Sequence, residues 1–174
     1  MENRDRRLLI GGMEDYSQWT ILGNDTENLA QAAIFPFGPG LDFDKKNGLA
    51  GKTYAGAYRA ITPNHRMSKY SILDRVVWPI HVSAKTDIAY AFVWLGTSST
   101  NYIELRYADT SITAARLNVC SVPLGQGYLN GTGAKLENLT YLAVGVVFDG
   151  EDDALANIYV GEIFLHQCAM VEDL

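Results

Sequence analysis

The sequence predicts an all-β fold: a single-domain antiparallel β-sandwich of the jelly-roll kind, with about nine strands and a long early insertion. Nearly every patterned segment either alternates apolar and polar residues or is a short run rich in Val, Ile, Tyr, Phe and Trp. Helical periodicity is scarce, and clusters of Gly, Asn, Asp, Ser and Pro separate the segments. With 174 residues, 48% of them hydrophobic, the chain suits one domain that spans residues 1–174.

The expected strands follow one another along the chain, with turn residues between them. In order, they are 8–10, 16–22, 53–61, 76–83, 88–95, 101–108, 115–122, 140–148 and 158–166. The segment 140–148 is apolar on both faces, so we expect it at the centre of a sheet with a packed layer on either side. This many short strands is typical of a sandwich or jelly roll.

Residues 23–51 interrupt this pattern and are predicted to form a long insertion loop. Residues 27–33 favour one or two helical turns, and the prolines and glycines that follow exclude regular structure. Long loops often make contacts, and exposed apolar residues tend to mark interfaces. Phe35, Phe37 and Leu41 are therefore candidate interface residues, with folding back over one end of the sandwich as the alternative.

The composition and charge exclude two classes of partner. A net charge of -6 would repel a phosphate backbone, so we expect no nucleic-acid binding. Residues 1–7 interleave arginines with acidic residues and are predicted to form a solvated N-terminal arm. No apolar run is long enough to span a bilayer, and residues 8–10 are too few for a secretion signal, so we expect no membrane association and a chain that begins at Met1.

No catalytic residue is expected. His65, His81 and His166 are far apart in the sequence and lack the spacing of metal ligands. Cys120 and Cys168 have no accompanying catalytic histidine pattern, and no serine lies in a nucleophile-elbow motif. We therefore expect a protein that is not an enzyme.

The two ends of the chain carry a family resemblance. The opening run LLIGGMED at 8–15, followed by Trp19, and the closing run IYVGEIFL at 158–165 each place an acidic residue in an otherwise apolar strand. A buried charge is costly unless it is paired, hydrogen-bonded or bound to a cation. Together with Val-Pro-Leu at 122–124, these runs resemble the galactose-binding-like jelly rolls that include many carbohydrate-binding modules. The resemblance implies the fold, and that fold hosts unrelated functions.

The resemblance also implies a structural calcium. Such modules commonly hold calcium near the first and last strands, where Glu14 and Glu162 are the matching carboxylates here. The alternatives for these two residues are hydrogen-bonded carboxylates or an ion pair with Lys52 or Arg59. Apart from calcium, no cofactor is expected.

A sugar-binding face on the middle strands is a further implication of the resemblance. Flat aromatic rings pack on the apolar face of a sugar ring, while nearby polar groups bind its hydroxyls. The candidate ligand-binding residues are Trp78, Trp94, Tyr102, Glu104 and Arg106.

Alternation assigns the residues of these strands to faces. Tyr90, Phe92 and Trp94 share one face, and an aromatic face of a central strand is more often core than binding surface. On the next strand, the even-numbered residues, which include Tyr102 and Arg106, form a polar face. We expect this face to contact a ligand or another subunit.

Three functions are compatible with these features. We expect a non-enzymatic virion structural protein: a bacteriophage head decoration, tail or baseplate component that also binds surface glycans. A single sandwich with its own Met1, no secretion signal and an apolar-rich insertion suits such a unit. Its partners would be other virion or assembly proteins, its state a homo-oligomer, and its location the virion, assembled in the host cytoplasm. The alternative is a carbohydrate-binding module or lectin-like domain, and the further alternative is an intracellular scaffold sandwich.

Overall fold

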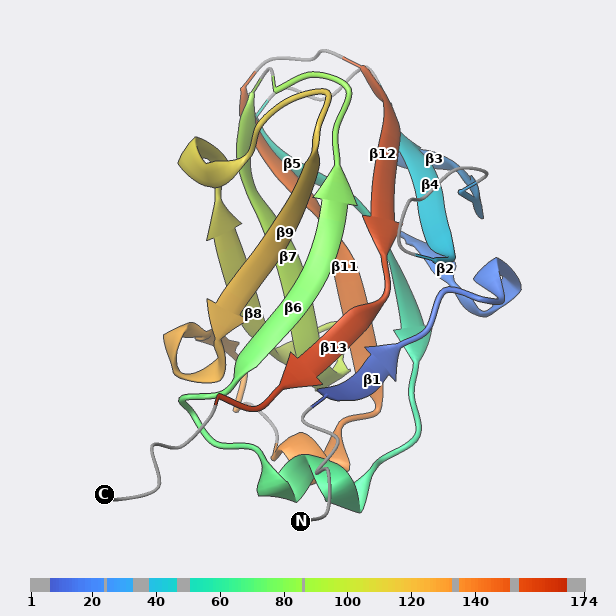
Figure 1. Cartoon of the computed structure of the whole chain (residues 1–174). Coiled ribbons are helices and arrows are strands. Elements are labelled where there is room, and N and C mark those ends of the chain that lie inside the picture. Colours follow the sequence, from blue (N-terminus) through green and yellow to red (C-terminus); the bar gives the residue numbers. More distant parts are fainter. Residues whose placement is uncertain are drawn as a thin grey trace.

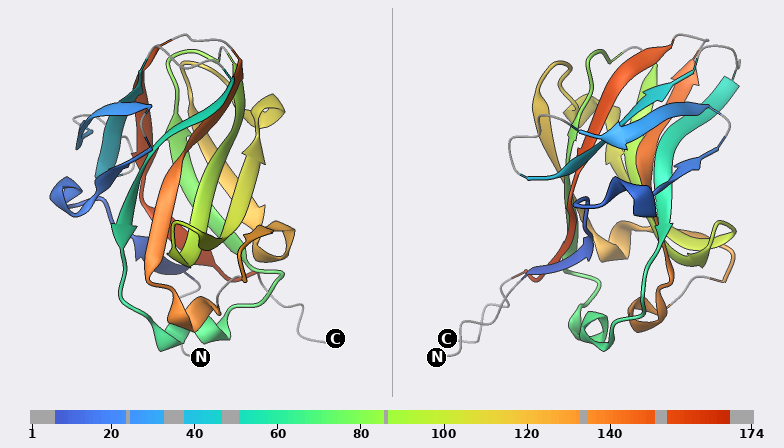
Figure 2. Two further views of the ribbon diagram at one scale, coloured as in Figure 1. Left: turned by 180° about the vertical axis from the view of Figure 1, so that it is seen from behind. Right: turned by 90° about the vertical axis from the view of Figure 1, so that its right-hand side faces the viewer.

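The computed structural model describes residues 7–23, 25–32, 38–46, 51–85, 87–132, 135–150 and 154–168. Within these residues the chain forms 13 strands in two sheets that face each other, joined by loops and short 3-10 turns (Figure 1 and Figure 2). The predicted all-β sandwich is confirmed, and its layout agrees with a jelly roll. No helix in the described ranges is long and apolar enough to cross a membrane.

Sheet A contains both ends of the described chain. Its strands, in spatial order, are β1 (Arg7–Gly11), β13 (Ile163–His166), β6 (Arg75–His81), β12 (Leu155–Gly161), β4 (Gly40–Lys45) and β3 (Thr26–Gln31), and β9 (Leu117–Pro123) pairs with β6. β13 and β12 pair with successive parts of β6, and β9 pairs along its whole length. In Figure 1 the first strand β1 lies beside β13, where Leu8 is opposite Leu165.

Sheet B has β11 in its interior, as the two-sided apolar pattern predicted. Its strands, in spatial order, are β10 (Tyr128–Asn130), β8 (Asn101–Ala108), β7 (Ile88–Ser98), β11 (Tyr141–Gly150), β5 (Gly51–Ala60) and β2 (Thr20–Leu22). This sheet is the near layer when the molecule is viewed from behind (Figure 2, left). All pairings within it are antiparallel.

The sandwich has two apolar clusters. The main core fills the space between the sheets, and β7 contributes Ala91, Val93 and Leu95 to it. A second cluster lies on the outer face of sheet B and includes Phe92 and Trp94. The aromatic face of β7 is buried, as expected, but in this second cluster and not in the main core between the sheets. The rings of Phe92 and Trp94 point away from sheet A and are buried within the second cluster. β7 is therefore buried on both of its faces.

The predicted insertion at 23–51 is largely sheet in the residues that the structure describes. β3 and β4 lie within it, so the helical turns expected at 27–33 were wrong. β3 is irregular: Asn28 has a φ of 55°, and the pairing with β4 shifts register between Glu27 and Ala30. Such a bulge breaks the alternation by which strands are recognised.

The interface residues expected in this segment are not found on an exposed loop. Leu41 lies in β4, is 0% exposed and belongs to the main core, so its side chain is not available for contacts with a partner. Phe35 and Phe37 lie outside the described residues. The remaining differences are small: η1 (Tyr16–Gln18) precedes β2, and Glu162 separates β12 from β13.

Candidate functional site

The outer face of sheet B has small residues along its middle strands. Gly145 of β11 lies between Gly56 of β5 and Phe92 of β7. A Cβ at position 145 would lie 2.2 Å from the carbonyl oxygen of Ala55 and 2.9 Å from the Phe92 ring. The glycine therefore allows both close strand approach and the packing of an aromatic ring over the strand.

Aromatic rings stack on the outer face of sheet B beside these glycines. The rings of Tyr102 and Trp94 are 4.3 Å apart at 14°, and those of Trp94 and Phe92 are 4.8 Å apart at 25°. Tyr54 from β5 meets Trp94 edge-on at 5.6 Å. We call Tyr102, Trp94 and Phe92 the aromatic stack. Phe92 and Trp94 are only 0% and 6% exposed, so they form the floor of the site, while Tyr54 and Tyr102 are half-buried.

Glu104 connects the aromatic stack to the rest of the face. Its Oε1 accepts hydrogen bonds from Trp94 Nε1 at 3.1 Å and from the Tyr90 hydroxyl at 3.3 Å. Its Oε2 accepts from Arg106 Nε at 2.7 Å and pairs with Arg106 Nη2 at 2.6 Å. Glu104 is 8% exposed, and these bonds explain how a carboxylate is buried there.

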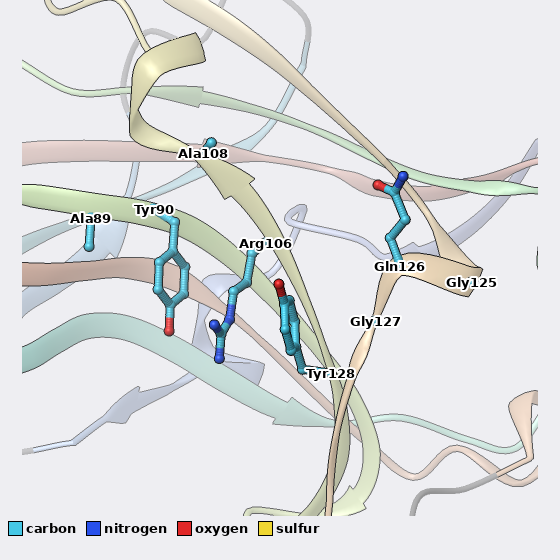
Figure 3. A pocket seen from close by; sticks show the side chains of 8 residues that line it. All are labelled: Ala89, Tyr90, Arg106, Ala108, Gly125, Gln126, Gly127 and Tyr128. Carbon is cyan, nitrogen blue, oxygen red and sulfur yellow. The ribbon is translucent and has the colours of Figure 1, made fainter.

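Arg106 lies between two tyrosine rings (Figure 3). Its guanidinium carbon is 4.7 Å from the ring centre of Tyr90 on β7 and 4.0 Å from that of Tyr128 on β10. Burial opposes the charge, but hydrogen bonding to Glu104 and its charge raise the pKa of Arg106 above the ordinary value. Burial, followed by the charge of Glu104, raises the pKa of Tyr90 to about 12. At neutral pH this arrangement therefore holds a charged Arg106 guanidinium beside a neutral Tyr90 phenol.

Two hollows open on this face, and both include Tyr90. The first, of about 590 Å³, lies between Tyr90, Arg106, Tyr128 and the backbone of 125–127 (Figure 3). The second, of about 370 Å³, is lined by Leu22, Tyr54, Tyr90, Trp94, Ser99, Tyr102, Glu104 and Val147. Together they offer flat aromatic rings beside hydroxyl and guanidinium groups.

Four of the five candidate ligand-binding residues meet on this face: Trp94, Tyr102, Glu104 and Arg106. Trp78 does not, because it lies on β6 of sheet A and is 0% exposed in the main core. The sequence reasoning missed Tyr128, because its strand of three residues is too short to show a pattern. Tyr54 was also missed, although alternation within β5 was a signal that could have placed it.

The carboxylates predicted to hold calcium lie close enough to repel one another. Burial, and then the charge of Glu14, raise the pKa of Glu162. The described residues contain no group of three or more His, Cys, Asp or Glu side chains arranged to hold a metal. Calcium takes about six to eight oxygen ligands, so this pair alone is a poor fit, and the calcium that the resemblance implied stays untested.

Backbone oxygens beside Glu14 already accept hydrogen bonds. The Gly12 carbonyl accepts from Trp19 Nε1 at 3.2 Å and from Arg59 Nη1 at 3.0 Å, and the Met13 carbonyl accepts from Gln31 Nε2 at 3.0 Å. Arg59 also lies over the Trp19 ring at 5.6 Å. Its guanidinium is therefore directed to this carbonyl and ring, and the hydrogen bonds it donates go to neutral oxygens.

Comparison with known proteins gives matches in structure. No family model matches the chain, and no curated protein matches it in sequence. The family 11 carbohydrate-binding module of a cellulosomal cellulase of Clostridium thermocellum is similar with a TM-score of 0.63 and 10% identity, over 96% of this chain and 98% of the module. The family 30 module of another cellulosomal cellulase of that organism has a TM-score of 0.53 and 11% identity, over 95% and 94%.

A third structure, described as carbohydrate-binding modules from the β-sandwich superfamily, has a TM-score of 0.56 and 13% identity, over 91% of this chain and 62% of that one. At such identities these likenesses establish a shared β-sandwich fold.

Proposed function

We propose that this protein is a carbohydrate-binding module that binds glycans on the outer face of sheet B. The observation that carries the proposal is the cluster in which Glu104 holds Trp94, Tyr90 and Arg106 beside two hollows. The carbohydrate-binding modules that share its sandwich fold support the same function.

The chemistry of the face suits a sugar. Tyr128 is 56% exposed, and Tyr102 and Tyr54 are half-buried, so their rings can pack against the C–H groups of a pyranose. Hydroxyl groups of the sugar can accept from the Arg106 guanidinium and exchange hydrogen bonds with the tyrosine hydroxyls. Because stacking and hydrogen bonds hold these side chains before a ligand arrives, little ordering cost accompanies binding.

We propose binding without catalysis. Glu104 and Arg106 are the charged groups that line the two hollows in the described residues, and Glu104 is occupied by its own protein partners. Glycoside hydrolysis generally uses a second carboxylate across the bond to be cleaved. Virion assembly and scaffolding have no observation of their own in the described residues, so both stay predictions.

A glycan array with the full chain tests the proposal. We expect wild-type protein to bind at least one glycan, and Tyr102→Ala and Tyr128→Ala to weaken that binding by about tenfold or more, since each removes an accessible ring. Tyr16→Ala is the matched control, because Tyr16 is 44% exposed on η1, outside the two hollows. Absence of glycan binding by folded wild-type protein would rule the function out.

A further inference from the structure

The two hollows carry one positive and one negative side chain in the part of the chain that the structure describes. Arg106 lines the first hollow and Glu104 the second, and among the described residues no other charged side chain lines either one. The two groups are in direct contact, with Arg106 Nη2 and Glu104 Oε2 2.6 Å apart. A ligand on this face therefore meets a pair whose formal charges cancel.

Glu104 is fixed in its position beside Arg106. To leave it, the carboxylate would have to abandon the hydrogen bond from Trp94 Nε1, which is buried, and the bond from the Tyr90 hydroxyl. An unpaired buried donor costs free energy comparable to a lost hydrogen bond. The carboxylate therefore cannot move aside cheaply to let a negatively charged ligand take its place.

Arg106 is fixed by the same contacts. The hydrogen bond from Nε and the ion pair from Nη2 to Glu104 both use one edge of the guanidinium, and tyrosine rings cover its two faces. The Nη1 edge can donate to an uncharged oxygen such as a hydroxyl. A carboxylate at that edge would feel both the guanidinium and, just behind it, Glu104, in a protein of net charge -6.

We infer that the Glu104–Arg106 pair restricts this face to uncharged glycans, and that Glu104 is the residue that excludes uronate sugars. The inference rests on the proposed carbohydrate binding and adds the class of sugar. Removing the charge of Glu104 leaves Arg106 as an uncompensated cation between two rings, which is an arrangement suited to a carboxylate.

Two pairs of polysaccharides test the inference, since the members of each pair share a backbone and differ in charge. They are hydroxyethyl cellulose with carboxymethyl cellulose, and methyl-esterified pectin with de-esterified pectin. Affinity electrophoresis gives the ratio of charged to neutral binding for each variant. We expect wild-type protein to prefer the neutral member, and Glu104→Gln to raise that ratio by about tenfold, as a newly exposed charged hydrogen bond would.

Three further variants control the experiment. Glu27→Gln makes the same change in net charge on β3 of sheet A and should leave the ratio unchanged. Arg106→Gln should lower the ratio, because it leaves a carboxylate without its cation. The double variant Glu104→Gln with Arg106→Gln should return it to the wild-type value. If Glu104→Gln does not fold, Arg106→Gln still tests the inference, because the inference predicts a lower ratio of charged to neutral binding for that variant.

The outcomes separate this inference from the proposed function. Wild-type binding to the charged members that equals or exceeds binding to the neutral ones would overturn the inference and leave carbohydrate binding intact. A Glu104→Gln ratio equal to that of Glu27→Gln, or wild-type binding to none of the four polysaccharides, would also overturn it. The glycan array decides the proposed function separately.

Discussion

Glu104 is buried and Asp42 is half-buried, and the two carboxylates have different environments. Both oxygens of Glu104 accept hydrogen bonds on sheet B. On β4 of sheet A, Asp42 has a buried Oδ1 for which no partner is found among the described residues. Burial, and then the charge of Asp44, raise the pKa of Asp42. The first carboxylate organises its surroundings, and the second destabilises the fold when it ionises.

Asp42→Asn should therefore stabilise the protein at neutral pH. The pKa of Asp42 is higher in the folded state than in the unfolded state, so folding takes up a proton at pH values between the two. Stability is therefore lost as pH rises through the folded-state pKa. We expect a gain in Tm of about 1–3 °C at neutral pH that vanishes as pH falls towards the ordinary aspartate range. Thermal denaturation at a series of pH values measures this.

Asp44→Asn is the control for that series. Asp44 accepts hydrogen bonds from Asn28 Nδ2 and from the backbone N–H of Asn157, each at 2.8 Å. The same change of charge should therefore lower Tm at neutral pH. A Tm gain for Asp42→Asn that persists unchanged into acid would show that its ionisation is not the cause.

At the scale of strands, glycines decide how closely β5, β11 and β7 approach. Gly145 and Gly56 are opposite each other in neighbouring strands, and Phe92 packs over Gly145. The aromatic stack on the outer face depends on this close approach, because a side chain at 145 would occupy the space of the Phe92 ring.

Gly145→Ala should lower the free energy of unfolding by about 1–3 kcal/mol, the usual cost of overpacking. The added methyl would meet the Ala55 carbonyl, which belongs to the backbone and cannot rotate away. Gly12→Ala is the matched control, since its nearest contact would be Leu9 at an ordinary 3.6 Å. Urea denaturation compares the two, and equal stability would show that β11 and β5 can separate without cost.

Most strands could be predicted from the sequence, because regular alternation marks a strand that is buried on one face. β3 was missed because Asn28 interrupts its alternation, and β10 because three residues carry no period. Alternation also explains why only part of the site could be predicted from the sequence. Alternation placed Tyr102 and Arg106 on one face, but a strand that is apolar on both faces, such as β7, does not reveal which face points outwards.

Glu162 lies between β12 and β13, close to Glu14 that follows the first strand. Its charge is opposed by burial and by Glu14. We expect Glu162→Gln to raise Tm by about 1–2 °C at neutral pH in the presence of EDTA. Because two carboxylates make a weak calcium site, we also expect millimolar calcium to shift the wild-type Tm by less than about 1 °C.

Glu14→Gln is the partner experiment. If repulsion between the two carboxylates is the cause, either substitution should relieve it, and the double variant should gain little more than a single one. A large calcium-dependent rise in wild-type Tm that is lost in Glu162→Gln would instead establish a structural calcium at this pair.

At the scale of the molecule, the two sheets have different roles. Sheet A joins the opening and closing strands and contributes one wall of the main core. Sheet B contributes the other wall and also has a second apolar cluster on its outer face. The two hollows are lined by residues from all six strands of sheet B as well as from the loop before β10. A ligand that filled both hollows would therefore contact every strand of sheet B.

Glycan binding should consequently stabilise the entire sandwich. A ligand at 100 times its Kd adds about 2.7 kcal/mol to the stability of the folded state, which corresponds to a rise in Tm of about 5–10 °C for a domain of this size. Differential scanning calorimetry with the glycan identified on the array measures the shift. Tyr128→Ala should reduce it and Tyr16→Ala should not. A Tm that stays constant while binding saturates would mean that the glycan attaches equally well to the unfolded chain, and hence that the folded face is not its site.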